Sequence, residues 1–127
     1  MKSLIVIPAR FKSSRLPGKP LKKIDGKELI LRVLNACEPL SQKGTKTIVA
    51  TDEKKIFNLV KFSNFRAIMT SKKCLTGTDR VAEAANKIRS KIYINVQGDE
   101  PTINPKDIRK VIETKKKFPN HVICGYD

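Results

Sequence analysis

Short apolar runs of strand length alternate along this 127-residue chain with segments whose apolar residues recur at helical spacing. This alternation predicts right-handed βαβ units, in which parallel strands form one sheet and helices cover both of its faces. We therefore expect an α/β fold. The predicted strands are Leu4–Ile7, Thr47–Ala50, Ala67–Met69 and Ile92–Val96, and Val122–Cys124 is the start of a possible fifth.

The segments between these runs carry the helices of a Rossmann-like, mainly parallel sheet. Ile24 to Lys27 has the composition of a tight turn, because it contains Asp25 and Gly26. The predicted helices are Lys27–Glu38, ended by Pro39; a segment with Ile56, Leu59 and Val60 that follows Asp52; Asp79–Arg89, capped by Thr78 and Asp79; and a last one from Asn104 and Pro105 to the lysines 115–117.

Length and composition indicate one domain, or part of one, in the cytoplasm. A hydrophobic content of 39% argues against disorder. No apolar run approaches the ~18 residues that span a bilayer, and Pro8 and Arg10 interrupt the first run too early for a secretory signal. Three scattered cysteines and a single histidine argue against a zinc site, disulfides and a cysteine–histidine couple.

The net charge of +15 raises the question of nucleic-acid binding. It comes from 27 basic and 12 acidic residues, and the basic ones are 20 lysines and seven arginines. The lysines are dispersed over every segment, aromatic residues make up only 6%, and no nucleic-acid motif is present. We therefore favour a lysine-rich solvated surface, with neither nucleic acid nor membrane as a partner.

The first predicted strand leads into a basic loop that contains Arg10, Arg15 and Lys19. Open α/β sheets bind ligands at the carboxyl ends of their strands, so a phosphate ligand is the natural expectation. The loop is neither Gly-x-Gly-x-x-Gly nor a Walker loop. Pro17 and Gly18 predict a stiff turn that aims Lys19, although the same residues also suit an ordinary exposed turn.

A second unusual loop, Gln97–Pro101, places Asp99 and Glu100 directly after the strand Ile92–Val96. Carboxylates in this position suit Mg²⁺ beside substrate phosphates, or they are simply solvated. The loops 9–20, 51–52, 70–78 and 97–101 all follow strands and should open on one edge of the sheet. On that edge Arg80 is a candidate for reaching a phosphate or a base, or for facing water.

Together these motifs resemble those of the 3-deoxy-manno-octulosonate cytidylyltransferases, the CMP-Kdo synthetases. Their order and spacing agree from about Leu4 to Ile112. The motifs are Ile7-Pro8-Ala9-Arg10, Ser14-Arg15-Leu16-Pro17-Gly18-Lys19-Pro20, Ala50-Thr51-Asp52, Gly77-Thr78-Asp79-Arg80 and Asn95-Val96-Gln97-Gly98-Asp99-Glu100-Pro101.

The resemblance implies a fold of the nucleotide-diphospho-sugar transferase type and an enzyme of lipopolysaccharide synthesis. Its reaction is Mg²⁺-dependent transfer of CMP from CTP to Kdo, with release of pyrophosphate. The implied roles are triphosphate binding and catalysis for Arg10 and Lys19, Mg²⁺ binding and catalysis for Asp99, and substrate binding for Ala9, Arg15, Thr78, Arg80 and Gln97, the last beside the sugar acid.

Members of this family continue with more sheet, a dimerisation region and a second Mg²⁺-binding aspartate. Residues 1–127 therefore resemble the CTP-binding half of a cytidylyltransferase domain, incomplete at its carboxyl end and homodimeric when full length. A sialic acid (N-acylneuraminate) cytidylyltransferase is the near alternative, although Gln97–Pro101 favours Kdo. A non-catalytic nucleotide-binding module and a nucleic-acid binder are the alternatives from other classes.

Overall fold

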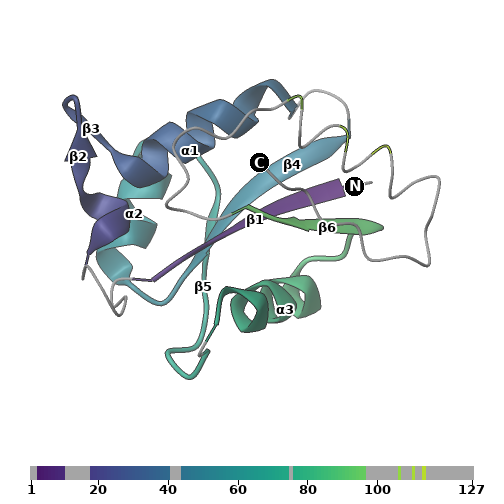
Figure 1. The fold of residues 1–127 in the computed structure, drawn as a ribbon. Coiled ribbons are helices and arrows are strands. Elements are labelled where there is room, and N and C mark those ends of the chain that lie inside the picture. Colours follow the sequence, from purple (N-terminus) through teal and green to yellow (C-terminus); the bar gives the residue numbers. More distant parts are fainter. Residues whose placement is uncertain are drawn as a thin grey trace.

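The computed structural model describes residues 3–10, 18–40, 44–74 and 76–96, together with Lys106, Lys110 and Glu113. Its centre is a four-stranded sheet in the order β5-β4-β1-β6 (Figure 1). All three pairings are parallel, so the predicted α/β sheet is confirmed. The strands are β1 Ser3–Ala9, β4 Thr45–Thr51, β5 Ala67–Met69 and β6 Ile92–Asn95.

Three helices cover the sheet, and they lie on both of its faces. In Figure 1, α1 and α2 lie on one side of the sheet and α3 on the other. Two 3₁₀ turns and a small antiparallel hairpin complete the described elements. The bounds are α1 Leu29–Cys37, α2 Lys54–Phe62, α3 Gly77–Lys87, η1 Lys19–Leu21, η2 Glu38–Leu40, β2 Lys23–Ile24 and β3 Lys27–Glu28.

Strand β1 supplies both halves of the core, because side chains alternate between the two faces of a strand. Ile5 and Ile7 pack with buried residues of α1 and α2, while Leu4 and Val6 pack with Ala84 of α3. All seven residues of β1 are buried. The apolar composition of this run therefore reflects a strand with helices on both sides.

Several boundaries differ from the sequence prediction. Helix α1 begins at Leu29 rather than Lys27, because Lys27 and Glu28 pair with β2. The predicted tight turn is present: Asp25 and Gly26 join β2 to β3, both with positive φ. Helix α1 ends at Cys37, and the chain continues through Pro39 as the 3₁₀ turn η2, residues 38–40.

Strand β6 is less buried than its apolar sequence suggests. Ile94 is buried, but Asn95 is exposed and the first two residues are half-buried. Within the described sheet β6 lies at an edge, with β1 as its neighbour. The predicted fifth strand lies outside the described residues, and of the last predicted helix only Lys106, Lys110 and Glu113 are described, all helical. No helix in the described ranges is long and apolar enough to cross a membrane.

Helix α2 offers a direct test of the core assignment. Ile56 is fully buried, whereas Phe62 is 90% exposed. We expect Ile56→Ala to lower the free energy of unfolding by about 2–5 kcal/mol, because it leaves a cavity. Phe62→Ala, in the same helix, should change it by less than about 0.5 kcal/mol. Urea denaturation followed by circular dichroism measures both values, and equal losses would contradict the packing of α2.

Candidate functional site

The carboxyl ends of three strands lie level with one another. Ala9 is the register partner of Thr51, and Thr51 is the partner of Met69. The residues that follow β1, β4 and β5 therefore emerge side by side on one edge of the sheet. This confirms, for the residues directly after β1, β4 and β5, the expectation that loops distant in sequence share that edge; the loop 97–101 lies outside the described residues.

The order of the strands places a switch point on the same edge. From β1 the chain proceeds outward through β4 to β5, and it then returns to the opposite side of β1 as β6. In open α/β sheets, ligands bind in the crevice at the carboxyl ends of the two strands where the direction reverses. Here the switch point lies between the ends of β1 and β6, beside Ala9 and Arg10.

Pro8 lies within β1, although a proline in an inner strand is unusual because it has no N–H to donate. The Val6 carbonyl accepts a hydrogen bond from the Val96 N–H at 3.0 Å, so the polar groups of Val6 face β6. Backbone direction alternates along a strand, which turns the Pro8 nitrogen to the same side. The described pairing with β6 ends at Val6 and Asn95, whereas pairing with β4 continues to Ala9. The missing donor thus faces β6 just beyond the described pairing of the two strands.

The position of Lys19 is determined by its neighbours in η1. Gly18 is buried and has a φ of 75°, a left-handed conformation that favours glycine. Its carbonyl accepts the Leu21 N–H at 2.9 Å, Pro20 is buried, and Leu21 packs against the core. Lys19 is therefore half-buried on a short, anchored turn. Arg10, at the end of β1, is exposed, and Ala9 before it is buried.

Helix α3 begins earlier than predicted, and a different threonine caps it. Thr76 is the N-cap: its hydroxyl accepts the Asp79 N–H at 3.1 Å, and the Asp79 carboxylate accepts the Thr76 N–H at 3.3 Å. The predicted cap at Thr78 is wrong, because Thr78 lies inside the first turn and is exposed. The hydroxyl of Thr78 therefore does not cap the helix.

Arg80 lies in surroundings that differ from those of an exposed ligand-binding arginine. It is only 1% exposed, and its guanidinium lies 3.3 Å from the Asp52 carboxylate. It also donates to the Thr70 hydroxyl and to the Ser71 carbonyl. These bonds direct the guanidinium into the protein, which argues against a direct phosphate contact. Sequence reasoning noted Asp52 but assigned it no partner, since helix spacing does not reveal contacts across 28 residues.

Three residues that the sequence assigned to the site, Arg15, Gln97 and Asp99, lie outside the described residues. The expected Mg²⁺ ligand is one of them. Among the residues that the structure describes, no group of three or more His, Cys, Asp or Glu side chains is arranged to hold a metal ion.

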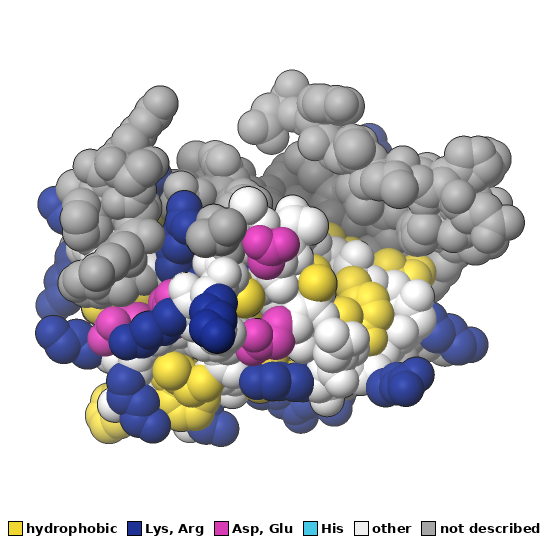
Figure 2. Space-filling model, turned by 90° about the horizontal axis from the view of Figure 1, so that it is seen from below, with side chains coloured by type: hydrophobic (Ala, Val, Ile, Leu, Met, Phe, Trp, Pro, Cys, Tyr) yellow, Lys and Arg dark blue, Asp and Glu magenta, His cyan; other side chains and the backbone are white. Residues whose placement is uncertain are grey.

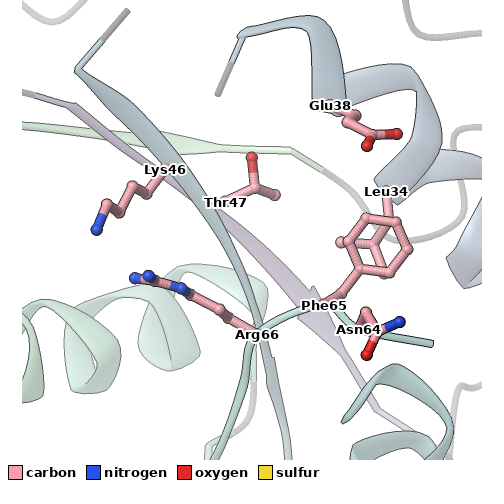
Figure 3. A pocket seen from close by; sticks show the side chains of 7 residues that line it. All are labelled: Leu34, Glu38, Lys46, Thr47, Asn64, Phe65 and Arg66. Carbon is pink, nitrogen blue, oxygen red and sulfur yellow. The ribbon is translucent and has the colours of Figure 1, made fainter. Parts of the chain in front are cut away.

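A hollow on the molecule lies away from this edge. Its lining comes from the start of β4, the end of α1 and the turn before β5 (Figure 3). In Figure 3, Lys46 and Arg66 point to one side of β4, whereas Leu34 and Phe65 lie on the other. Because the hollow is next to the amino ends of β4 and β5, it does not belong to the candidate site.

Basic side chains are spread over the surface. On the face drawn in Figure 2, Lys and Arg side chains are scattered, with acidic side chains between them. Nucleic-acid binding surfaces concentrate cations in one patch or stripe, so this distribution favours a solvated surface.

A comparison with family models matches residues 4–124 to the family described as "Cytidylyltransferase". The chain belongs to the cytidylyltransferase family. It is 43% identical over 119 residues to the 3-deoxy-manno-octulosonate cytidylyltransferase of Escherichia coli, covering 93% of this chain and 48% of that protein. It is 47% identical over 114 residues to the protein of the same name from Saccharophagus degradans, covering 87% and 44% respectively.

Solved structures of cytidylyltransferases share the fold. A CMP:2-keto-3-deoxy-manno-octonic acid synthetase complexed with CTP matches with a TM-score of 0.87 and 42% identity, over 94% of this chain and 49% of that one. A cytidylyltransferase from Leptospira borgpetersenii serovar Hardjo-bovis, 24% identical, matches with a TM-score of 0.75 over 90% and 48%. This chain spans about half the length of the relatives it matches. The resemblance to the CMP-Kdo synthetase family is thus confirmed.

The capping assignment can be tested with two threonines two residues apart. Thr76→Ala removes the hydroxyl that accepts from Asp79, so we expect a loss of about 1 kcal/mol in the free energy of unfolding. Thr78→Ala should cost less than about 0.5 kcal/mol, because Thr78 is exposed. Thermal denaturation of both variants provides the measurement, and a larger loss for Thr78→Ala would restore the sequence-based assignment.

Proposed function

We propose that this chain is the CTP-binding part of an enzyme that transfers CMP from CTP to Kdo and releases pyrophosphate. The observation that carries the proposal is the match, at 42% identity and a TM-score of 0.87, to the structure of a synthetase complexed with CTP. The switch point beside Arg10 supports it independently, because nucleotides bind at such points in open α/β sheets.

The chemistry of the transfer suits a cationic edge. The anomeric hydroxyl of the sugar acid attacks the α-phosphorus of CTP, a new oxygen–phosphorus bond forms, and the bond to the β-phosphate breaks. Negative charge accumulates on the α-phosphate and on the departing pyrophosphate. Fixed cations that face this charge lower the barrier. We assign this role to Arg10 and Lys19, and we place Ala9 and Arg15 beside the triphosphate.

Further assignments rest on the sequence. Asp99 is the proposed ligand of Mg²⁺, which when bound would neutralise charge on the phosphates. Gln97 would lie near the sugar acid, and Thr78, with an exposed side chain, near the nucleotide. A homodimer, a cytoplasmic location and a role in lipopolysaccharide synthesis are proposed for the complete protein on the same basis.

Kdo is favoured over sialic acid by the relatives, which carry the name 3-deoxy-manno-octulosonate cytidylyltransferase at 40–47% identity. This chain covers about half of each relative, and this observation supports one other function, a nucleotide-binding module without turnover. The two are separated by pyrophosphate release, since both bind CTP and only the enzyme uses it.

Titration calorimetry of the chain with CTP and Mg²⁺ tests the binding function. Turnover is tested in a chimera in which this chain replaces the matching segment of the E. coli relative. We expect Mg²⁺-dependent pyrophosphate release from CTP only when Kdo is present. CTP binding without release in the chimera would favour the module, and absence of CTP binding would contradict both functions.

Lys19 is the cation whose anchored position makes the sharpest prediction. In the chimera we expect Lys19→Ala to lower kcat/KM for CTP by about 100-fold or more, because a fixed positive charge facing the transition state is lost. Lys22→Ala, three residues away and exposed, should change it by less than about threefold. Steady-state kinetics of pyrophosphate release compare the two variants, and equal effects would contradict the role of Lys19.

A further inference from the structure

Residues 70–74, which follow β5, start on the same edge as the proposed nucleotide site. The start of this segment is held by a hydrogen bond from the Thr70 N–H to the Thr51 carbonyl at 2.8 Å. In the order β1-β4-β5 it lies two strands from Arg10, which at ~4.8 Å per strand is roughly 10 Å away. A nucleotide with its phosphates over β1 can meet this segment only with its nucleoside end.

Arg80 connects this segment to the two neighbouring elements. From α3 it pairs with Asp52 after β4 at 3.3 Å, and it donates to the hydroxyl of Thr70 and to the carbonyl of Ser71. The side chain of Arg80 is 2% exposed and that of Asp52 19%. A guanidinium is stable in a buried position only when its charge is balanced and its N–H groups are hydrogen-bonded. Arg80 therefore fixes α3 relative to the residues that follow β4 and β5.

Glu83 holds the same segment from the next turn of α3. Both of its carboxylate oxygens accept the Ser71 N–H, at 3.2 and 3.0 Å, and the Cys74 thiol lies 3.8 Å from one of them. The hydrogen bond from Ser71 is the main reason why the pKa of Glu83 lies below its ordinary value. Lys87, one turn further on, lies 3.4 Å from Glu83 and donates to the Met69 carbonyl at 2.9 Å.

We infer that Arg80 and Glu83 are positioning residues, which hold the backbone of Thr70 and Ser71 so that residues 70–74 meet the nucleoside end of the bound nucleotide. This inference rests on the proposed CTP-binding function. It assigns Arg80 no contact with the substrate, because its guanidinium is occupied by Asp52, Thr70 and Ser71. Glu83 accepts from the N–H of Ser71 and Arg80 donates to its carbonyl, so the two peptide groups on either side of the Ser71 Cα are both held.

Inorganic tripolyphosphate separates positioning from phosphate binding, because it occupies the phosphate part of the site and has no nucleoside. Three variants are compared. Glu83→Ala removes both oxygens that accept from Ser71, and Glu83→Gln keeps one of them. Arg80→Lys keeps the positive charge but cannot form the several hydrogen bonds of a guanidinium. Arg89→Lys is the matched control, since Arg89 is exposed just after α3. Circular dichroism verifies folding, and the Glu83 series suffices if Arg80→Lys does not fold.

We expect the Kd for CTP, measured by calorimetry with Mg²⁺, to rise at least tenfold in Glu83→Ala and Arg80→Lys and less in Glu83→Gln. The Kd for tripolyphosphate should stay within twofold. Amide hydrogen exchange at Ser71 should accelerate in the same order without ligand, and Arg89→Lys should match the parent chain.

Two results would overturn the positioning role and leave the proposed function intact. One is faster exchange at Ser71 with an unchanged Kd for CTP; the other is an equal loss of affinity for CTP and tripolyphosphate in Arg80→Lys, which would make Arg80 a phosphate ligand. A parent chain that binds CTP no more tightly than tripolyphosphate would instead contradict the proposed function itself, and the inference with it.

Discussion

The parallel pairing of β1 with β4 is the constraint on which the remaining structure depends. It runs over all seven residues of both strands and ends with Ala9 opposite Thr51. Because β1 is buried on both faces, a shift of this register by one residue would exchange the side chains that face α1 and α2 with those that face α3. The pairing therefore sets both cores and the level at which Arg10 and Asp52 leave the sheet.

The cations assigned to the functional edge differ in their burial. Arg10 is exposed at the end of β1, and Lys19 is half-buried in η1. Arg80 is buried and carries the same formal charge, but Asp52 balances it internally. A net charge of +15 conceals this difference in burial, which only the structure reveals.

Much of the fold was predictable from the sequence, because strands and helices differ in apolar period. The run Ala67–Met69 was predicted with its observed bounds, and the turn at Asp25 and Gly26 follows from residues that tolerate positive φ. The N-cap was misplaced because two threonines precede Asp79; Thr76, three residues before it, has the spacing of a capping box, whereas Thr78 is its direct neighbour. The burial of Arg80 and the role of Glu83 depend on contacts between elements, which no local pattern encodes. Asp99, Gln97 and Arg15 remain sequence-based predictions.

Pro8 gives the edge a property that side-chain contacts do not provide. The charge of an ionisable side chain changes with pH, and its field is screened by salt. Here β1 lacks a backbone hydrogen on the side of β6, two residues beyond the bond between Val96 and Val6. The backbone of β1 therefore cannot donate a hydrogen bond at Pro8, and because the proline ring is covalent, this restriction is the same at every pH and salt concentration.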